Sequence, residues 1–307
     1  MKRLIITILT PLLLIAIAGA FIQGIITTAE EHSIQERFGN IDYAQYGIDT
    51  ENWNALMDNA VHDERLISIL EHIQVYSNDM IKLAIVNPDA RDYAANYWQH
   101  TDEQTAPSDI ELTCSGSGVP LLFQWDSRWG YNLYGGKPMG LTGCGPTSLS
   151  MVSIALTGNT ALNPLYLARF SEEHDFYVTG VGTSWDLMRS GAAALGLNWQ
   201  EVGLNQEDMY AALDQGAYLI CSMLPGDFTT SGHFIVIDGY DSTGFTVKDP
   251  NSAERSRSWS YDRLAGQIAV IWAYSIESYP CIFRHFSICW ILTKKANHAK
   301  IMQPIQA

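Results

Sequence analysis

Four apolar runs in the second half of the chain place the tightest limits on its fold. They span Tyr218–Met223, His233–Tyr240, Gly244–Lys248 and Ala269–Ala273. Each has the length and the composition of a β-strand. Only Asp241-Ser242-Thr243 separates the second run from the third, and this polar turn predicts an antiparallel hairpin. Helical patterns precede the runs at Pro146–Thr157, Ser184–Leu195 and Gln206–Leu213. We therefore predict an α+β fold with helices packed on an antiparallel sheet.

The N-terminus carries a separate signal. Residues 4–26 form an apolar run without a charged residue, directly after Lys2 and Arg3. A helix of roughly 20 apolar residues spans a bilayer, and the preceding positive charges would keep this end in the cytoplasm. The run is either a signal peptide cleaved after Ala18-Gly19-Ala20 or an uncleaved anchor. Its apolar character continues beyond Ala20, which favours the anchor. Both alternatives predict that the rest of the chain is extracytoplasmic.

Charge divides the remaining chain into segments. The net charge is −15, and residues 28–113 alone hold 17 acidic and 4 basic residues. We predict that 28–113 is an acidic, mostly helical segment that ends in a polar linker and can be deleted without loss of the following fold. Residues 118–277 form the glycine- and aromatic-rich α+β domain, and 278–307 are a basic tail of unknown role. Because nucleic-acid binding needs a basic face, we predict no nucleic-acid partner.

Cys144 is the first candidate for chemistry. It lies in Gly143-Cys144-Gly145-Pro146, directly before the helix predicted over Pro146–Thr157. The N-terminus of a helix carries partial positive charge and free N–H groups, which favour the nucleophilic thiolate form of a cysteine. The simpler alternative is a small buried cysteine that begins a helix.

A nucleophilic cysteine needs a base and a group that orients the base. His233 opens the apolar run His233–Tyr240, and Asp249 follows the run Gly244–Lys248. If these runs form a hairpin, the start of the first and the end of the second meet at one sheet edge, within hydrogen-bond reach. A carboxylate there would fix the imidazole tautomer. The alternatives are a core histidine and an Asp-Pro turn residue.

Gln124 is the candidate donor to the oxyanion of a tetrahedral intermediate. It lies among aromatic residues, 20 positions before Cys144, and its amide could act beside the backbone N–H of Cys144. The alternative is a polar surface residue. No Cys-x-x-Cys, His-Glu-x-x-His or P-loop lysine motif is present among the 307 residues, so we predict no metal and no organic cofactor.

Four motifs in this order carry a family resemblance. They are Phe123-Gln124-Trp125-Asp126 with Trp129, Gly143-Cys144-Gly145-Pro146-Thr147, Gly232-His233-Phe234-Ile235-Val236 and Lys248-Asp249-Pro250-Asn251. Over about residues 118–275 the chain resembles papain-like cysteine peptidases related to the bacteriocin-processing, double-glycine leader peptidases, in their stand-alone, secreted bacterial branch. Gly182-Thr183-Ser184-Trp185 and Pro225-Gly226-Asp227-Phe228 also match that branch. No transporter segment follows the domain, so leader removal coupled to export is not implied.

The resemblance implies a papain-like fold, with the nucleophile at a helix N-terminus packed on an antiparallel sheet. It makes Cys144 the nucleophile, His233 the base, Asp249 the orienting acid and Gln124 the oxyanion donor. We expect a cysteine peptidase of the bacterial cell envelope that hydrolyses peptide or isopeptide bonds in a peptide or protein substrate. It would be anchored by the N-terminal helix, or secreted if that segment is cleaved. The alternatives are a cell-wall peptide amidase or transpeptidase on the same triad, and a non-catalytic peptide-binding module.

Overall fold

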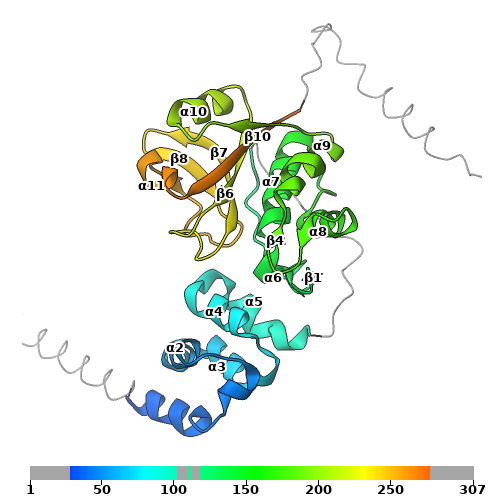
Figure 1. Cartoon of the computed structure of the whole chain (residues 1–307). Helices are drawn as coiled ribbons and strands as arrows, with labels where there is room; N and C mark the ends of the chain where they lie inside the picture. Colours follow the sequence, from blue (N-terminus) through cyan, green and yellow to red (C-terminus); the bar gives the residue numbers. More distant parts are fainter. Residues whose placement is uncertain (1–27, 102–109, 111, 113–117, 277–307) are drawn as a thin grey trace, which may run out of the picture. The chain divides into compact units, whose positions relative to one another are not determined.

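A computed structural model of the chain describes residues 28–101, 110, 112 and 118–276 (Figure 1). The predicted membrane segment at 4–26 and the basic tail at 278–307 lie outside these residues. Among the described helices, none combines the length and the apolar character that crossing a membrane requires.

Residues 28–101, called here the helical segment, form short helices around their own apolar core. Residues 28–38 are helical. The elements that follow are η1 (Tyr43–Tyr46), α2 (Thr50–Ala60), α3 (Glu64–Glu71), η2 (Ile73–Val75), α4 (Asn78–Val86), η3 (Pro88–Ala90), α5 (Arg91–Asn96) and η4 (Tyr97–Gln99). Asp49, Asp63 and Ser77 cap α2, α3 and α4, because each side chain accepts a hydrogen bond from a first-turn N–H. Leu56, Leu66 and other fully buried side chains from these helices fill the centre.

Residues 118–276 contain a six-stranded antiparallel sheet in the order β5-β10-β6-β7-β8-β9. Its strands are β5 (Asn198–Val202), β6 (Tyr218–Met223), β7 (His233–Asp241), β8 (Gly244–Lys248), β9 (Ser258–Trp259) and β10 (Ile268–Ser275). Two further two-stranded ribbons pair β1 (Leu133–Tyr134) with β2 (Lys137–Pro138), and β3 (Tyr177–Val178) with β4 (Gly182–Thr183). The predicted hairpin is confirmed, because Asp241 pairs with Gly244 across the turn.

Helices cover both faces of this sheet (Figure 1). They are α6 (Met139–Thr142), α7 (Cys144–Thr157), α8 (Pro164–Glu173), the π-helical turn η5 (Leu187–Gly191), α9 (Ala192–Ala194), α10 (Gln206–Asp214) and α11 (Tyr261–Ala265). Phe234 and Val236 of β7 pack in one apolar cluster with α7 and α8, whereas Ile235 and Ile237 pack in another with α10 and α11. Burial on both faces explains why β7 reads as a continuous apolar run.

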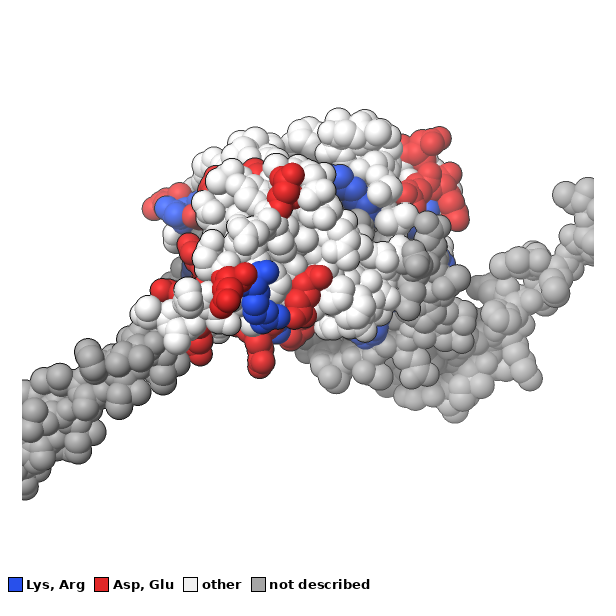
Figure 2. Space-filling view, turned by 90° about the horizontal axis from the view of Figure 1, so that it is seen from below, with Lys and Arg blue, Asp and Glu red and all other residues white. Residues whose placement is uncertain are grey.

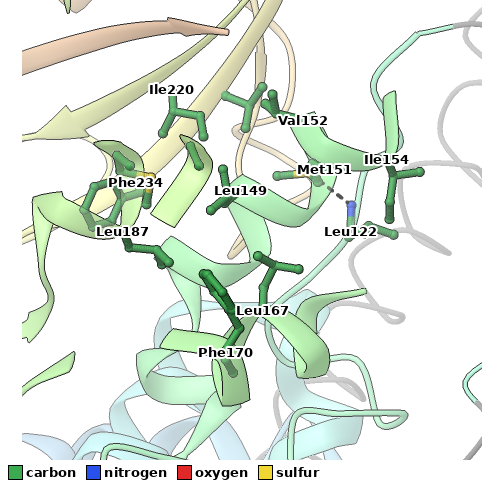
Figure 3. Close-up of a cluster of buried hydrophobic side chains, with 14 of the residues drawn as sticks. Leu122, Leu149, Met151, Val152, Ile154, Leu167, Phe170, Leu187, Ile220 and Phe234 are labelled. Atoms are coloured by element: carbon green, nitrogen blue, oxygen red, sulfur yellow. Dashed lines mark hydrogen bonds between the residues drawn. The ribbon is translucent and has the colours of Figure 1, made fainter. Parts of the chain in front are cut away.

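An apolar cluster surrounds α7. Leu149 and Val152 of α7 meet Leu167 of α8 and Ile220 of β6, and all four side chains are fully buried (Figure 3). The backbone N–H of Leu122 donates to the sulfur of Met151 at 3.3 Å (Figure 3). This packing on several sides holds α7, and therefore the residue at its N-terminus, in one position.

The helical segment packs directly against the domain that follows it. Its apolar core includes Tyr131, with Trp125 and Leu141 packed against it. The hydroxyl of Tyr93 donates to the carbonyl of Gly130 at 2.8 Å, and the hydroxyl of Tyr131 donates to the carbonyl of Tyr93 at 3.1 Å. These buried contacts join the two parts of the chain, and deletion of residues 28–113 without loss of the following fold stays a prediction.

Charges on the described surface occur mostly in small groups. On the face shown in Figure 2, acidic side chains lie in separate clusters, some with a basic side chain beside them, across a broad uncharged area. Arg37 with Glu71 and Lys137 with Asp79 are examples of exposed pairs in the described part of the chain. Such exposed pairs contribute little to stability, typically about 0–1 kcal/mol each.

Candidate active site

Cys144 is the first residue of α7, so the helix begins two residues before Pro146, where the sequence predicts its start. The helix runs for 14 residues to Thr157 and ends at Gly158, which has a φ of 68°. No side chain caps its N-terminus, where Gly143 is the N-cap. The thiol is therefore partly exposed at the positive end of a long helix dipole.

His233 and Asp249 meet at the edge of the β7–β8 hairpin. Nε2 of His233 lies 2.8 Å from Oδ1 of Asp249. The His233 residue is 7% exposed and Asp249 is fully buried. Val236 pairs with Lys248, and a register shift between Ile237 and Gly239 adjusts the hairpin before its turn. The proximity predicted from the hairpin is confirmed.

The electrostatics of this pair favour an imidazolium beside a carboxylate. Burial acts to lower the pKa of His233, but the charge of Asp249, the hydrogen bond to Asp249 and the nearby Cys144 thiol outweigh it and raise that pKa to about 10. Burial acts to raise the pKa of Asp249, but His233 and then Arg255 hold it below its usual value. Cys144 lines the same cleft as His233, so the thiol lies beside this buried pair.

Arg255 is a member of the site that the sequence reasoning missed. Its Nε donates to Oδ2 of Asp249 at 2.5 Å, while the backbone N–H of Asn251 donates to Oδ1 at 2.7 Å. The hydroxyl of Ser256 accepts from the backbone N–H of Asp249 at 2.9 Å. All these residues lie within a short polar turn after β8. Nothing in that polar sequence indicates that the side chain of Arg255 folds back onto Asp249.

Gln124 is buried, with 4% of its surface exposed, and lines the same cleft as Cys144 and His233. Its Nε2 donates to the carbonyl of Gly140 at 2.7 Å, and its backbone N–H donates to the carbonyl of Pro250 at 2.7 Å. An amide nitrogen carries two hydrogens, so one donor of Gln124 remains after the bond to Gly140. Its Oε1 has no hydrogen-bond partner among the described residues.

The cleft has a volume of about 470 Å³. Cys144, Gln124 and His233 line it together with α4 of the helical segment and the loop at residues 226–232. Trp125 and Trp129 are not among the residues that line the cleft. Their indole N–H groups donate to the carbonyls of Asn251 and Phe123. Within the described residues, no cluster of three or more His, Cys, Asp or Glu side chains has the geometry to bind a metal ion.

The fold mixes helix and sheet, and one cleft contains a cysteine at a helix N-terminus and the histidine of a buried His–Asp pair. Residues 117–279 match the model of the Peptidase_C39-like family. The chain belongs to this family and is a cysteine-type peptidase, as the resemblance implied. A comparison with curated proteins found no match.

Two solved structures are similar to parts of the chain. One is the peptidase domain of Streptococcus ComA, a bifunctional ABC transporter of a quorum-sensing pathway, at 17% identity and a TM-score of 0.36. The match covers 44% of this chain and 93% of that domain. The other is assigned to the C39-like peptidases of Bacillus anthracis, at 16% identity and a TM-score of 0.32, covering 53% and 96%. At these scores, family membership stands on the sequence match alone.

Proposed function

We propose that the chain is an extracytoplasmic peptidase that hydrolyses peptide or isopeptide bonds through Cys144, His233, Asp249 and Gln124. The observation that carries the proposal is the buried 2.8 Å contact between His233 and Asp249, with Cys144 lining the same cleft as the histidine. A cysteine, a base and an acid that orients the base are the parts that acyl transfer to a thiol needs.

In the first half of the reaction, the thiolate of Cys144 attacks the carbonyl carbon of the substrate, and the carbonyl π electrons move to oxygen. The remaining N–H of Gln124 and the backbone N–H of Cys144 donate to this oxyanion. Nε2 of His233 is engaged by Asp249, so Nδ1 is the atom that gives a proton to the leaving amine. The C–N bond breaks and a thioester remains on Cys144.

In the second half, water attacks the thioester carbonyl while Nδ1 of His233 takes a proton from it. The C–S bond breaks, the acid product leaves, and the thiolate–imidazolium pair is restored. Asp249 stays ionised throughout, because it holds the imidazole in one tautomer and offsets its charge.

Incubation of the full chain with a peptide library derived from digested casein, read by mass spectrometry, tests this function. We expect new peptide termini with the wild type and none with Cys144→Ala. Hydroxylamine added during turnover distinguishes hydrolysis from transfer, because a transferase would convert most of the acyl-enzyme to hydroxamate. A wild type that alkylates at Cys144 but cleaves nothing would contradict the peptidase assignment for these peptides.

We also propose that residues 4–26 stay attached and anchor the chain, on the evidence of their uncharged apolar sequence alone. Fractionation of expressing bacterial cells, followed by sequencing of the mature N-terminus, tests this. We expect the intact chain in the membrane fraction and accessible to external protease. A released product that begins at Phe21 would leave the secretory alternative.

A further inference from the structure

One face of α4 lines the cleft. Four of its residues border the cavity, and they occupy positions i, i+3, i+4 and i+7 of the helix: Asp79, Lys82, Leu83 and Val86. This spacing places them along a single stripe. The neighbouring Met80, Ile81 and Ala84 are fully buried in the core of the helical segment. The helix therefore contacts both the core of the helical segment and the cleft that contains Cys144, and Leu83, which is 7% exposed, belongs to both.

We propose that this face of α4 is a wall of the substrate site, and that Leu83 and Val86 bind an apolar side chain of the peptide substrate. The proposal rests on the peptidase function above and adds a specificity-determining surface to it. Val86 is 65% exposed although it is a large apolar residue. A bound apolar side chain would remove it from water, which is favourable in proportion to the area covered.

The loop at residues 226–232, which also lines the cavity, does not offer such a surface. It contributes the polar residues Thr229, Thr230 and Ser231. Phe228 in this loop is only 4% exposed and packs against Trp259. Among the apolar residues that line the cleft, Val86 of α4 is therefore the most exposed.

Contacts between the two parts of the chain hold α4 at the cleft. The side-chain amide of Asn87, directly after α4, donates to the carbonyl of Asn251. The backbone N–H of Ala253 donates to Oδ2 of Asp89 at 3.1 Å. At the start of the stripe, Asp79 accepts from Nζ of Lys137 at 2.8 Å, so its charge is already paired.

Tyr93 packs the helical segment against Gly130 and Gly140. A Cβ on Gly140 would lie 2.5 Å from the ring of Tyr93, and one on Gly130 would lie 2.9 Å from it. The two glycines thus form a flat surface on which the ring lies. Gly140 is also the residue whose carbonyl accepts from Gln124. A wall anchored this close to the candidate oxyanion donor is positioned to contact residues next to the reacting bond.

The test compares full-chain wild type with Val86→Lys and with the control Val181→Lys. Val181 is 82% exposed and does not line the cleft, so both changes place a lysine on a solvent-exposed position. The probes are tripeptidyl acyloxymethyl ketones with leucine, glutamate or lysine at each position, which label Cys144 without turnover. Labelling by iodoacetamide reports the thiol alone. Cleavage of the casein peptide library reports preferences on both sides of the cleaved bond.

We expect the wild type to prefer leucine over glutamate by about 10-fold at one position, since an open apolar contact discriminates at the low end of what pockets achieve. Val86→Lys should invert this preference toward glutamate, while Val181→Lys and all iodoacetamide rates stay as in the wild type. The inversion supports the proposal. Unchanged preferences in Val86→Lys, in both labelling and cleavage, overturn it. If the wild type cleaves no peptide, the peptidase function fails separately, and labelling alone decides whether α4 contacts the probe.

Discussion

Nε of Arg255 lies 2.5 Å from Oδ2 of Asp249, the carboxylate oxygen that His233 does not contact. Asp249 is thus held between two cationic groups while it is fully buried. A buried carboxylate with a single partner would retain a costly unpaired oxygen. Arg255 is 25% exposed along its side chain and lines the cleft, so it reaches the buried acid from the solvent side.

In the proposed mechanism Arg255 is a positioning residue, and its loss should act through Asp249. In Arg255→Gln we expect kcat/KM on a cleaved peptide to fall about 10–100-fold, because the orienting carboxylate is less firmly ionised and less firmly held. Arg255→Lys should recover part of the loss. The acid limb of the pH–rate profile should move to higher pH in the glutamine variant only. Arg37→Gln, which breaks an exposed pair with Glu71, is the control, and an unmoved acid limb would argue for a purely structural role.

The raised pKa of His233 predicts a stability that depends on pH. The folded state keeps the imidazole proton above pH 6.5, where the unfolded chain loses it. The stabilisation is therefore complete below pH 6.5 and is lost as pH rises through the folded pKa, by at most about 1.4 kcal/mol per pH unit. Urea unfolding from pH 6 to 10 measures it. Adding Asp249→Asn should flatten the difference, and equal slopes in both backgrounds would contradict the charged pair.

Gln124→Ala should slow acyl transfer without slowing alkylation. Removal of one oxyanion donor typically costs about 2.7–4 kcal/mol, or about 100- to 1000-fold in kcat. Alkylation of Cys144 by iodoacetamide forms no oxyanion, so its rate should stay within about twofold of the wild type. Slowed peptide turnover with normal alkylation would support Gln124 as the oxyanion donor. A parallel fall in both rates would instead assign Gln124 to support of the turn at Gly140, its observed partner.

Gly140→Ala should force the helical segment away from the site. The new Cβ would lie 2.5 Å from Cζ and Oη of Tyr93, and overpacking of this kind costs about 1–3 kcal/mol. The cost should nearly vanish in a Tyr93→Ala background, measured as a double-mutant cycle of urea unfolding. Gly266→Ala is the control, because its φ is −74° and an added Cβ meets no atom within 4 Å. Additive effects at Gly140 and Tyr93 would show that the ring can move aside freely.

The two cysteines in the described part of the chain should differ sharply toward iodoacetamide. Burial raises the pKa of the Cys221 thiol, which lies fully covered in β6. Cys144 is partly exposed at the mouth of the cleft. Peptide mapping should find Cys144 modified within minutes at pH 7 and Cys221 modified only in urea. Rapid modification of Cys221 in the native protein would indicate that the sheet opens locally.

The strands and helices that could be predicted are those in which the spacing of apolar residues indicates which side chains are buried. β6, β7, β8 and α10 lie within one or two residues of the predicted ranges, because each has an apolar pattern with a clear stop. The edge strand β5 was missed, since four of its five residues are exposed and Asn198–Val202 lacks an apolar alternation. The helix predicted over Ser184–Leu195 contains the π-helical turn η5. The spacing of apolar residues does not indicate this irregularity.

The candidate site could be predicted where a residue borders a regular element. His233 and Asp249 flank a hairpin, so strand pairing alone brings them together. Arg255 could not be predicted, because its direction depends on a polar turn that folds back on Asp249. The role of α4 in the cleft was also invisible. It depends on packing between segments more than 50 residues apart, and the polar linker between them suggested independence.

The bond between Asn87 and the carbonyl of Asn251 joins residues 164 positions apart, and this separation affects the order of folding. The helices of 28–101 and the β7–β8 hairpin can each form from nearby residues, whereas this bond must close a long loop first. The contact between Asn87 and the turn that carries Asp249 should therefore form late in folding. During refolding, helical and sheet signals should recover before the reactive thiol does, so enzymatic competence is a property of the completed tertiary structure.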